Sequence, residues 1–428
     1  MSKNKTKCPK CGDEFVNLGA HMVSHDSPNE GVTKIKVIGI GGGGGNITSR
    51  MKQKNEGRIK GIDYVAINTD VQDLENTNAD EKIQIGEALT EGRGAGMEPS
   101  IGRQAAEENK SKIGNAVEGA DIAFITCGLG GGTGTGAAPV VAETAKGKDI
   151  LTIGIVTKPF SFEGDQRMSI AQEGLGKLED KVDALVVIPN DRVFSVISED
   201  TPINEAFTYI DDVLNHGVQA IADLINMPGI INVDFADIES ILKDAGPSVI
   251  GVGTGEGEDR SAQAIGGAIN SPLLESSIEG AKGALFSIAG GEDLRMSEIE
   301  DVAKSIVSNL DSNAQVIFGA YHDKGLEGEN IKITVIATGF NGLLQNGGTQ
   351  SAPGKVPQLF SQSDSSNGTT VEVNQDVDEE GEIIDTVDEE SNDKKGEKSD
   401  EGEKEYEDDS DSSGPWDIPT FLRKGKDN

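Results

Sequence analysis

The sequence is poor in cysteine, in basic side chains and in long apolar runs. Its 38 basic residues face 74 acidic ones, which gives a formal net charge of −36. Such a surface disfavours broad nucleic-acid binding, because contact with phosphates needs basic stripes. With only three cysteines, a disulfide scaffold is excluded and a reducing cytoplasm is favoured. No run of about 18 apolar residues occurs and no signal peptide opens the chain, so we expect no direct membrane insertion.

Five short β-branched runs alternate with glycine-rich turns and helical stretches in the first half of the chain. Each run suits a strand buried on both faces, which predicts an α/β fold with a parallel, doubly wound sheet. The runs are IKVIGI (35–40), DYVAINTD (63–70), DIAFITCG (121–128), ILTIGIVT (150–157) and ALVVIPN (184–190).

One long amphipathic helix is predicted from Ile203 to Asn226. Thr201 is the candidate N-cap, with Pro202 at the first helical position. Apolar residues recur at spacings of three and four, which gives a stripe along one face. The stripe consists of Ile203, Phe207, Ile210, Leu214, Val218, Ile221 and Ile225.

A second α/β unit is predicted after this helix and is expected to end near Phe340. Its strand candidates are 247–255, 283–290, 314–322 and 331–340, and its helix candidate is 297–309. Residues 341–413 contain few large apolar groups and many acidic ones, so we expect a disordered acidic linker. Its root-mean-square span would be about 50 Å.

Two glycine-rich loops follow predicted strands and open predicted helices. The first covers residues 39–46 and the second covers 128–136; a third glycine cluster lies at 92–96. Glycines let backbone N–H groups approach an anion at a helix N-terminus, and Thr133 and Thr135 add hydroxyls that can bind phosphate or a metal-bound water. The first loop alone also fits a dinucleotide site or a tight turn. A second loop favours a nucleoside triphosphate, and no P-loop motif is present.

Several motifs resemble those of FtsZ, the prokaryotic tubulin homologue, in order and spacing over roughly residues 34–340. They are GGGGGN (41–46), INTD (67–70), GLGGGTGTGAAP (128–139), TKPFSFEGDQRM (157–168), IPND (188–191) and INVDFADI (231–238). The resemblance implies a tubulin-type fold and a cytoplasmic GTPase of cell division. Such a protein polymerises with itself head to tail and organises the division ring at midcell. The acidity and the N-terminal module favour an archaeal source.

The resemblance also implies the site residues for GTP or GDP, with Mg²⁺ bound beside the nucleotide. Glu163 and Arg167 would contact ribose and phosphate, and Asn190 and Asp211 would contact guanine. A carboxylate can accept both the N1–H and the N2 amino protons of guanine, and adenine offers no such pair. Without the resemblance, Asp211 reads as part of a solvated helix face. The implied phosphate-binding residues are Gly42, Gly43, Gly44, Gly45, Asn46, Gly132, Thr133 and Gly134.

Asn232, Asp234 and Asp237 are the candidate catalytic residues. Two carboxylates three residues apart can orient a water that attacks a γ-phosphate. An aspartate capping the next helix is the alternative, and both hold if Asp237 caps while Asp234 reaches out. The long helix rises about 22 Å from Asp211 to its end. The pair would therefore serve a stacked neighbour's nucleotide, and such a non-closing interface generates a filament.

The two ends of the chain carry motifs of their own. Cys8, Cys11, His21 and His25 predict a C2H2-like zinc finger with structural Zn²⁺, although the gap between the pairs is shorter than usual. The alternative is a reduced CxxC beside two unrelated histidines. A nucleic-acid partner is possible only through this module, and a protein partner is as plausible. Residues 415–423 resemble the FtsZ peptide that docks onto membrane-anchor or division proteins.

We therefore expect six segments and weigh two other functions. The segments are the finger (1–28), the GTP-binding domain (34–200), the central helix (201–227), the C-terminal α/β domain (228–340), the linker (341–413) and the partner-binding peptide (414–428). A nucleotide-binding scaffold that hydrolyses little is disfavoured by the intact carboxylate loop. An NAD-dependent oxidoreductase is disfavoured because it gives the second glycine loop no role.

Overall fold

The computed structural model describes most of the chain between residues 33 and 340. The described residues are 6–7, 14–15, 33–55, 61–198, 200–227, 229–271, 277–323, 326 and 330–340. The predicted zinc ligands Cys8, Cys11, His21 and His25 lie outside them, as do the predicted linker and C-terminal peptide. Among the described residues, no helix is long and apolar enough to cross a membrane.

The first half of the fold is a parallel sheet, as predicted. Its strands are β3 (Ile35–Ile40), β4 (Ile62–Asn68), β5 (Glu81–Gln84), β6 (Ile122–Gly128), β7 (Leu151–Lys158) and β8 (Ala184–Pro189). They lie in the order β8-β7-β6-β3-β4-β5. All five predicted strands are confirmed, and only the short edge strand β5 is additional.

The second half continues the same sheet and makes it mixed. It contains β9 (Gly246–Glu256), β10 (Gly283–Gly290), β11 (Gln315–His322) and β12 (Asn330–Thr338) in the order β11-β10-β12-β9. Strand β12 is antiparallel to both of its neighbours. The two halves are joined where residues 184–186 of β8 pair in parallel with residues 246–248 of β9. The second α/β unit predicted from the sequence is therefore present, and its strands extend the first sheet to ten strands.

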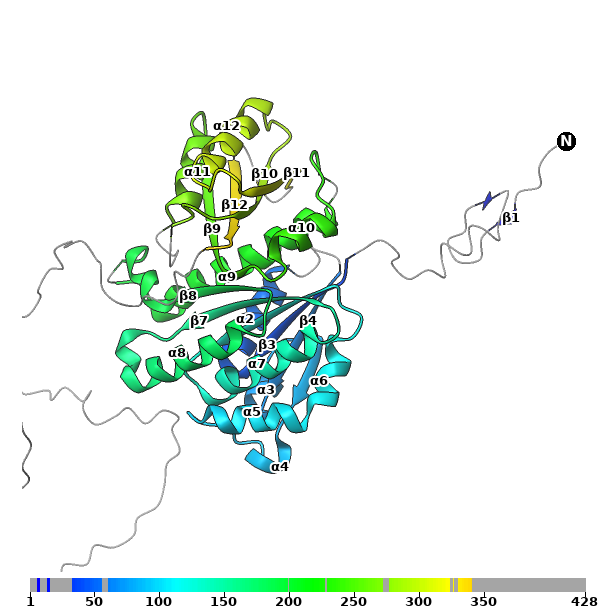
Figure 1. Cartoon of the computed structure of the whole chain (residues 1–428), viewed down its shortest axis with the longest axis vertical. Helices are drawn as coiled ribbons and strands as arrows, with labels where there is room; N and C mark the ends of the chain where they lie inside the picture. The colour runs from blue at the N-terminus through cyan, green and yellow to red at the C-terminus, as the bar shows by residue number, and fades with distance from the viewer. Residues whose placement is uncertain are drawn as a thin grey trace, which may run out of the picture. The chain divides into compact units, whose positions relative to one another are not determined.

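Helices cover both faces of this sheet (Figure 1). They are α2 (Gly41–Asn55), α3 (Val71–Asn76), α4 (Glu87–Thr90), α5 (Pro99–Glu108), α6 (Lys110–Val117), α7 (Gly132–Lys146), α8 (Asp165–Glu179), α9 (Ile203–Asn226), α10 (Phe235–Leu242), α11 (Arg260–Ile269) and α12 (Met296–Val307). Helices α5 to α8 form one apolar core with the parallel strands, and α2, α9 and α10 form another on the opposite face. A third core joins α11 and α12 to the second half.

The central helix α9 has the predicted bounds but differs from prediction at its start. Its N-cap is Pro202, and the Thr201 hydroxyl accepts a hydrogen bond from the Ser198 N–H instead. The middle of the predicted apolar stripe is buried. Ile203 and Phe207, however, are 64% and 37% exposed. The first turns of the helix therefore carry apolar side chains that the core does not cover.

Candidate functional site

The first glycine loop lies at the carboxyl end of β3 and opens α2. A Cβ on Gly44 would stand 2.5 Å from the Thr126 carbonyl oxygen, and one on Gly39 would collide with Thr48. Only glycine therefore lets this loop pack against β6. The packing leaves the N–H groups of the first turn of α2 at the edge of the sheet, where a helix N-terminus attracts anions.

The second and third glycine clusters meet the first. A Cβ on Gly41 would stand 3.0 Å from the Gly134 nitrogen, so the starts of α2 and α7 are adjacent. The Gly132 N–H donates to the Gly96 carbonyl over 2.7 Å, which ties the third cluster to the second. Two helix N-termini thus converge on one place, an arrangement suited to a multiply charged phosphate chain.

The two threonine hydroxyls of the second loop are bonded within the protein. Oγ1 of Thr133 lies 2.6 Å from Oγ1 of Thr69, and Oγ1 of Thr135 accepts from the Gly130 N–H over 2.9 Å. The expected contact of Thr135 with phosphate or a metal-bound water does not fit this position. Its hydroxyl shapes the loop, and the residue lines a different pocket.

A pocket of about 330 Å³ lies beside the glycine loops, between α2, α9 and the turn after β7. Six predicted nucleotide-binding residues line it: Gly43, Asn46, Glu163, Arg167, Asn190 and Asp211. The other six belong to the adjoining loops and are not among its lining residues: Gly42, Gly44, Gly45, Gly132, Thr133 and Gly134. The pocket also contains Arg50, Thr157 and Phe207, which the sequence analysis missed.

Asp211 is a nearly buried carboxylate in this pocket, 4% exposed. Burial raises its pKa, and the ion pair with Arg50 opposes that rise by stabilising the ionised form. Asn190 is also buried, and its Oδ1 has no hydrogen-bond partner among the described residues. A buried polar atom without a partner is costly. An amide and a carboxylate so placed fit the polar edge of a purine base.

Aromatic side chains cluster at the mouth of the pocket. The Phe160 ring is buried, and its centroid lies 4.8 Å from that of Phe162, 5.5 Å from that of Phe194 and 5.8 Å from that of Phe207. Phe162 and Phe194 are 70% and 56% exposed. Glu163, which follows Phe162 in the chain, forms an ion pair with Arg167, with 2.9 Å between Oε2 and Nη1. An apolar patch therefore borders the nucleotide pocket on the surface of the subunit.

The predicted catalytic residues lie just beyond the opposite end of α9. The Asn232 side chain accepts from the Gly229 N–H over 2.7 Å, and Asp234 is the N-cap of α10, accepting from the Asp237 N–H over 2.8 Å. The aspartate cap that the sequence offered as the alternative is therefore present, but Asp234 provides it rather than Asp237. All three side chains are exposed. Within the described part of the chain, the Asp237 carboxylate has neither a hydrogen bond nor an ion pair.

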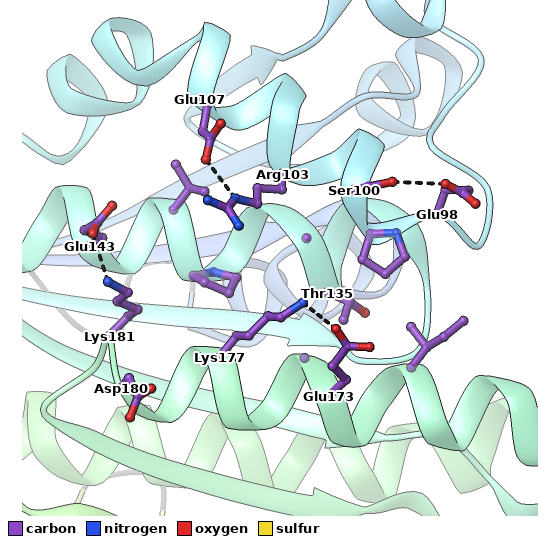
Figure 2. Close-up of a pocket in the computed structure, with 16 residues that line it drawn as sticks. Glu98, Ser100, Arg103, Glu107, Thr135, Glu143, Glu173, Lys177, Asp180 and Lys181 are labelled. Atoms are coloured by element: carbon purple, nitrogen blue, oxygen red, sulfur yellow. Dashed lines mark hydrogen bonds and ion pairs between the residues drawn. The ribbon is translucent and has the colours of Figure 1, made fainter.

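A larger pocket, of about 550 Å³, lies on the other side of α7, between α5 and α8 (Figure 2). Thr135 lines it, but none of the predicted nucleotide or catalytic residues does. Its basic side chains are paired with neighbouring carboxylates, as in Arg103–Glu107 and Lys177–Glu173. Among its described lining residues, no basic side chain is therefore free for a phosphate group. No cluster of three or more metal-binding side chains occurs in the described segments.

Comparison with known proteins identifies both halves of the fold. Residues 34–198 match the GTPase domain of the Tubulin/FtsZ family, and residues 246–341 match the C-terminal domain of the FtsZ family. The structure of an empty FtsZ dimer from M. jannaschii matches this chain with 44% sequence identity and a TM-score of 0.68. The match covers 75% of this chain and 91% of the M. jannaschii chain. The GTPγS-bound CetZ2 protofilament from Haloferax volcanii matches at 23% identity, 71% and 92% coverage and a TM-score of 0.61, a likeness of fold alone.

Proposed function

The chain belongs to the FtsZ family of tubulin-like GTPases, and we propose that it acts in cell division. Its subunits stack head to tail into cytoplasmic filaments, hydrolyse GTP to GDP and phosphate between neighbours, and organise the division ring at midcell. The source is archaeal. The proposal keeps the domain limits predicted from the sequence, which are 34–200 for nucleotide binding, 201–227 for the central helix and 228–340 for the C-terminal domain.

The nucleotide is held at the convergence of the glycine loops. The phosphates lie on residues 42–46 and 132–134, ribose and phosphate meet Glu163 and Arg167, and guanine meets Asn190 and Asp211. Support comes from the adjacent helix starts and from the buried amide and carboxylate in the pocket. Mg²⁺ bound with the nucleotide would neutralise charge on the β- and γ-phosphates.

Hydrolysis is completed by Asn232, Asp234 and Asp237 of the adjacent subunit. The observation that carries this proposal is their position: they are exposed and follow the end of a 24-residue helix that begins at the nucleotide pocket. From Asp211 to its end, that helix rises about 22 Å. The exposed aromatic patch beside the pocket supports a contact with another subunit there.

The experiment that tests the function measures phosphate release from GTP per subunit, with Mg²⁺ and high KCl, over a wide range of protein concentration. A site shared between subunits predicts almost no release at low concentration and a steep rise above a threshold. A rate per subunit that does not depend on concentration would mean that one chain holds the whole site, and the shared-site proposal would fail.

Both ends of the chain carry accessory functions. Residues 1–28 bind one structural Zn²⁺ through Cys8, Cys11, His21 and His25. Two observations support this zinc site. One is the spacing of the four residues, and the other is the antiparallel pairing of β1 (Thr6–Lys7) with β2 (Glu14–Phe15), two strands that flank the two cysteines in the sequence. Residues 415–423 dock onto membrane-anchor or division proteins, tethered by the acidic linker 341–413.

Deletions separate these ends from the enzyme. Loss of 1–28 should remove one bound zinc per chain, measured by metal analysis, and loss of 414–428 should abolish recruitment to the membrane in cells. Either deletion should leave GTP hydrolysis by assembled protein largely intact, because the proposed nucleotide-binding and catalytic residues all lie between Gly42 and Asp237. Loss of hydrolysis after deletion of 1–28 would contradict an independent module.

A further inference from the structure

Three consecutive residues of β11 hold both the end of α9 and the loop that follows it. Ala320 exchanges backbone hydrogen bonds with Ile231, over 3.1 Å in each direction, and its carbonyl also accepts from the Ile230 N–H over 2.7 Å. Gly319, one residue earlier, leaves room for the last turn of α9, since a Cβ there would stand 2.5 Å from Leu224 Cδ2. The loop that carries Asn232 and Asp234 is therefore fixed to β11 rather than to the helix.

The third residue, Tyr321, supplies a polar link to the helix itself. Its hydroxyl donates to Oδ2 of Asp223 over 3.0 Å, and the two residues are only 3% and 4% exposed. Asp223 lies in the last turn of α9, where its carbonyl also accepts from the Met227 N–H over 2.9 Å. Burial and the neighbouring Asp223 carboxylate raise the pKa of Tyr321 well above its usual value, so the phenol stays protonated and keeps donating.

We propose that Tyr321, through Asp223, is a positioning residue that sets the register between α9 and the catalytic loop. The inference rests on the proposed role of Asn232, Asp234 and Asp237. The first half of α9 contributes Asp211 to the nucleotide pocket, whereas the loop is hydrogen-bonded to β11. Contacts at the far end of the helix therefore help to set the distance from one site to the other, in addition to the packing of α9 in the core. A displacement of about 1 Å at reacting groups can cost roughly a hundredfold in rate.

The Tyr321 hydroxyl also has the Ser287 side chain of β10 as a hydrogen-bond partner, and Ala320 and Gly319 add backbone and apolar contacts. Apolar contacts tolerate sliding better than a buried, charge-assisted hydrogen bond does. Such a bond has a narrow range of favourable distances and angles. Removing the Tyr321 hydroxyl would keep the ring and its packing but remove the hydrogen bond between β11 and Asp223 in the last turn of α9. The nucleotide pocket, at the other end of the helix, would keep its residues.

The test compares Tyr321→Phe with Tyr64→Phe. Tyr64 is also a buried tyrosine whose hydroxyl is hydrogen-bonded, accepting from the Asn55 side chain over 3.0 Å, but it lies in the first half on β4. Turnover is measured per assembled subunit, with the assembled fraction determined by sedimentation, and GTP affinity is measured separately at low concentration. Thermal stability is recorded for both variants.

Tyr321→Phe should lower turnover per assembled subunit about tenfold or more and leave GTP affinity unchanged. Tyr64→Phe should lose similar thermal stability but keep wild-type turnover. Asp223→Asn, which keeps an acceptor oxygen but loses the charge, should have a turnover between that of the wild type and that of Tyr321→Phe. The proposal is overturned if Tyr321→Phe turns over like the wild type, or if Tyr64→Phe loses as much.

Asp237→Ala separates this result from a failure of the proposed function. If Asp237→Ala is inactive and Tyr321→Phe is fully active, only the positioning role is wrong. If both variants are fully active, the catalytic loop itself has been misassigned.

Discussion

At the scale of single residues, Asp211 shows how a pocket can keep a buried carboxylate charged. Burial favours the neutral acid and raises the pKa, and the Arg50 guanidinium favours the ionised form. Only the ionised carboxylate can accept two N–H groups of guanine. Because the pKa remains raised, guanine recognition should begin to weaken on acidification at a higher pH than for an exposed aspartate.

Asp211→Asn should weaken GTP binding by about 10- to 100-fold, because an amide donor then faces the guanine N–H groups. Xanthosine triphosphate carries a carbonyl at that position and should regain affinity. Titration with a fluorescent nucleotide measures both. The control is Asp212→Asn, because the Asp212 side chain is more exposed than that of Asp211 and pairs with Lys54. This variant should keep normal affinity for GTP. Unchanged GTP binding by Asp211→Asn would remove Asp211 from the guanine site.

At the scale of elements, the start of α10 divides two tasks between two aspartates. Asp234 accepts from the backbone of the first turn as the N-cap, whereas the Asp237 carboxylate faces solvent without a partner among the described residues. Removing a capping aspartate costs about 1 kcal/mol. The exposed Asp237 carboxylate, three residues later, contributes less to stability. Asp234→Ala and Asp237→Ala should therefore differ in their effect on thermal stability.

Asp237→Ala should keep thermal stability, GTP binding and assembly but lose most hydrolysis. Asp234→Ala should lose hydrolysis and, in addition, about 1 kcal/mol of stability. Glu239→Ala on the same helix removes only an exposed pair with Lys243 and should change neither property. Phosphate release and thermal melts of the three variants measure these effects. Normal hydrolysis by Asp237→Ala would contradict the proposed catalytic role of Asp237.

The secondary-structure elements also show how much of the fold and of the site could be predicted from the sequence. Strand β3 and the long helix α9 are readable because burial on both faces, or along one stripe, leaves a periodic apolar pattern. Strand β5 was missed because only Ile83 in it is buried. The glycine loops and Asp211 came from motifs. Arg50 and Phe207 could not be found, because α2 and α9 meet in the pocket through packing that neither local sequence encodes.

At the scale of the whole molecule, we expect the exposed rings beside the pocket to contact another subunit in the proposed filament. Ile203 and Phe207 interrupt the buried stripe of α9 at this same place. Large apolar side chains gathered on one surface indicate a contact with another molecule. Assembly through this surface would explain why the core leaves that part of the apolar stripe uncovered.

Phe162→Ser should raise the protein concentration needed for assembly about tenfold or more, because burying a phenylalanine contributes about 1.5–3 kcal/mol. Light scattering across a concentration series measures the threshold. Met296→Ser is the matched control, since Met296 is 72% exposed on α12, in the second half of the fold. GTP binding at low concentration should be normal in both variants. An equal shift of the two thresholds would show that the patch has no special place in the filament.

The packing of the first glycine loop has a consequence in genetics. Every single-nucleotide change of a glycine codon that alters the amino acid introduces a Cβ or stops translation. At Gly39 and Gly44 that one carbon already collides with Thr48 or with the backbone of β6. No missense allele at these codons is conservative, and a saturation library selected for viability would return both positions as glycine.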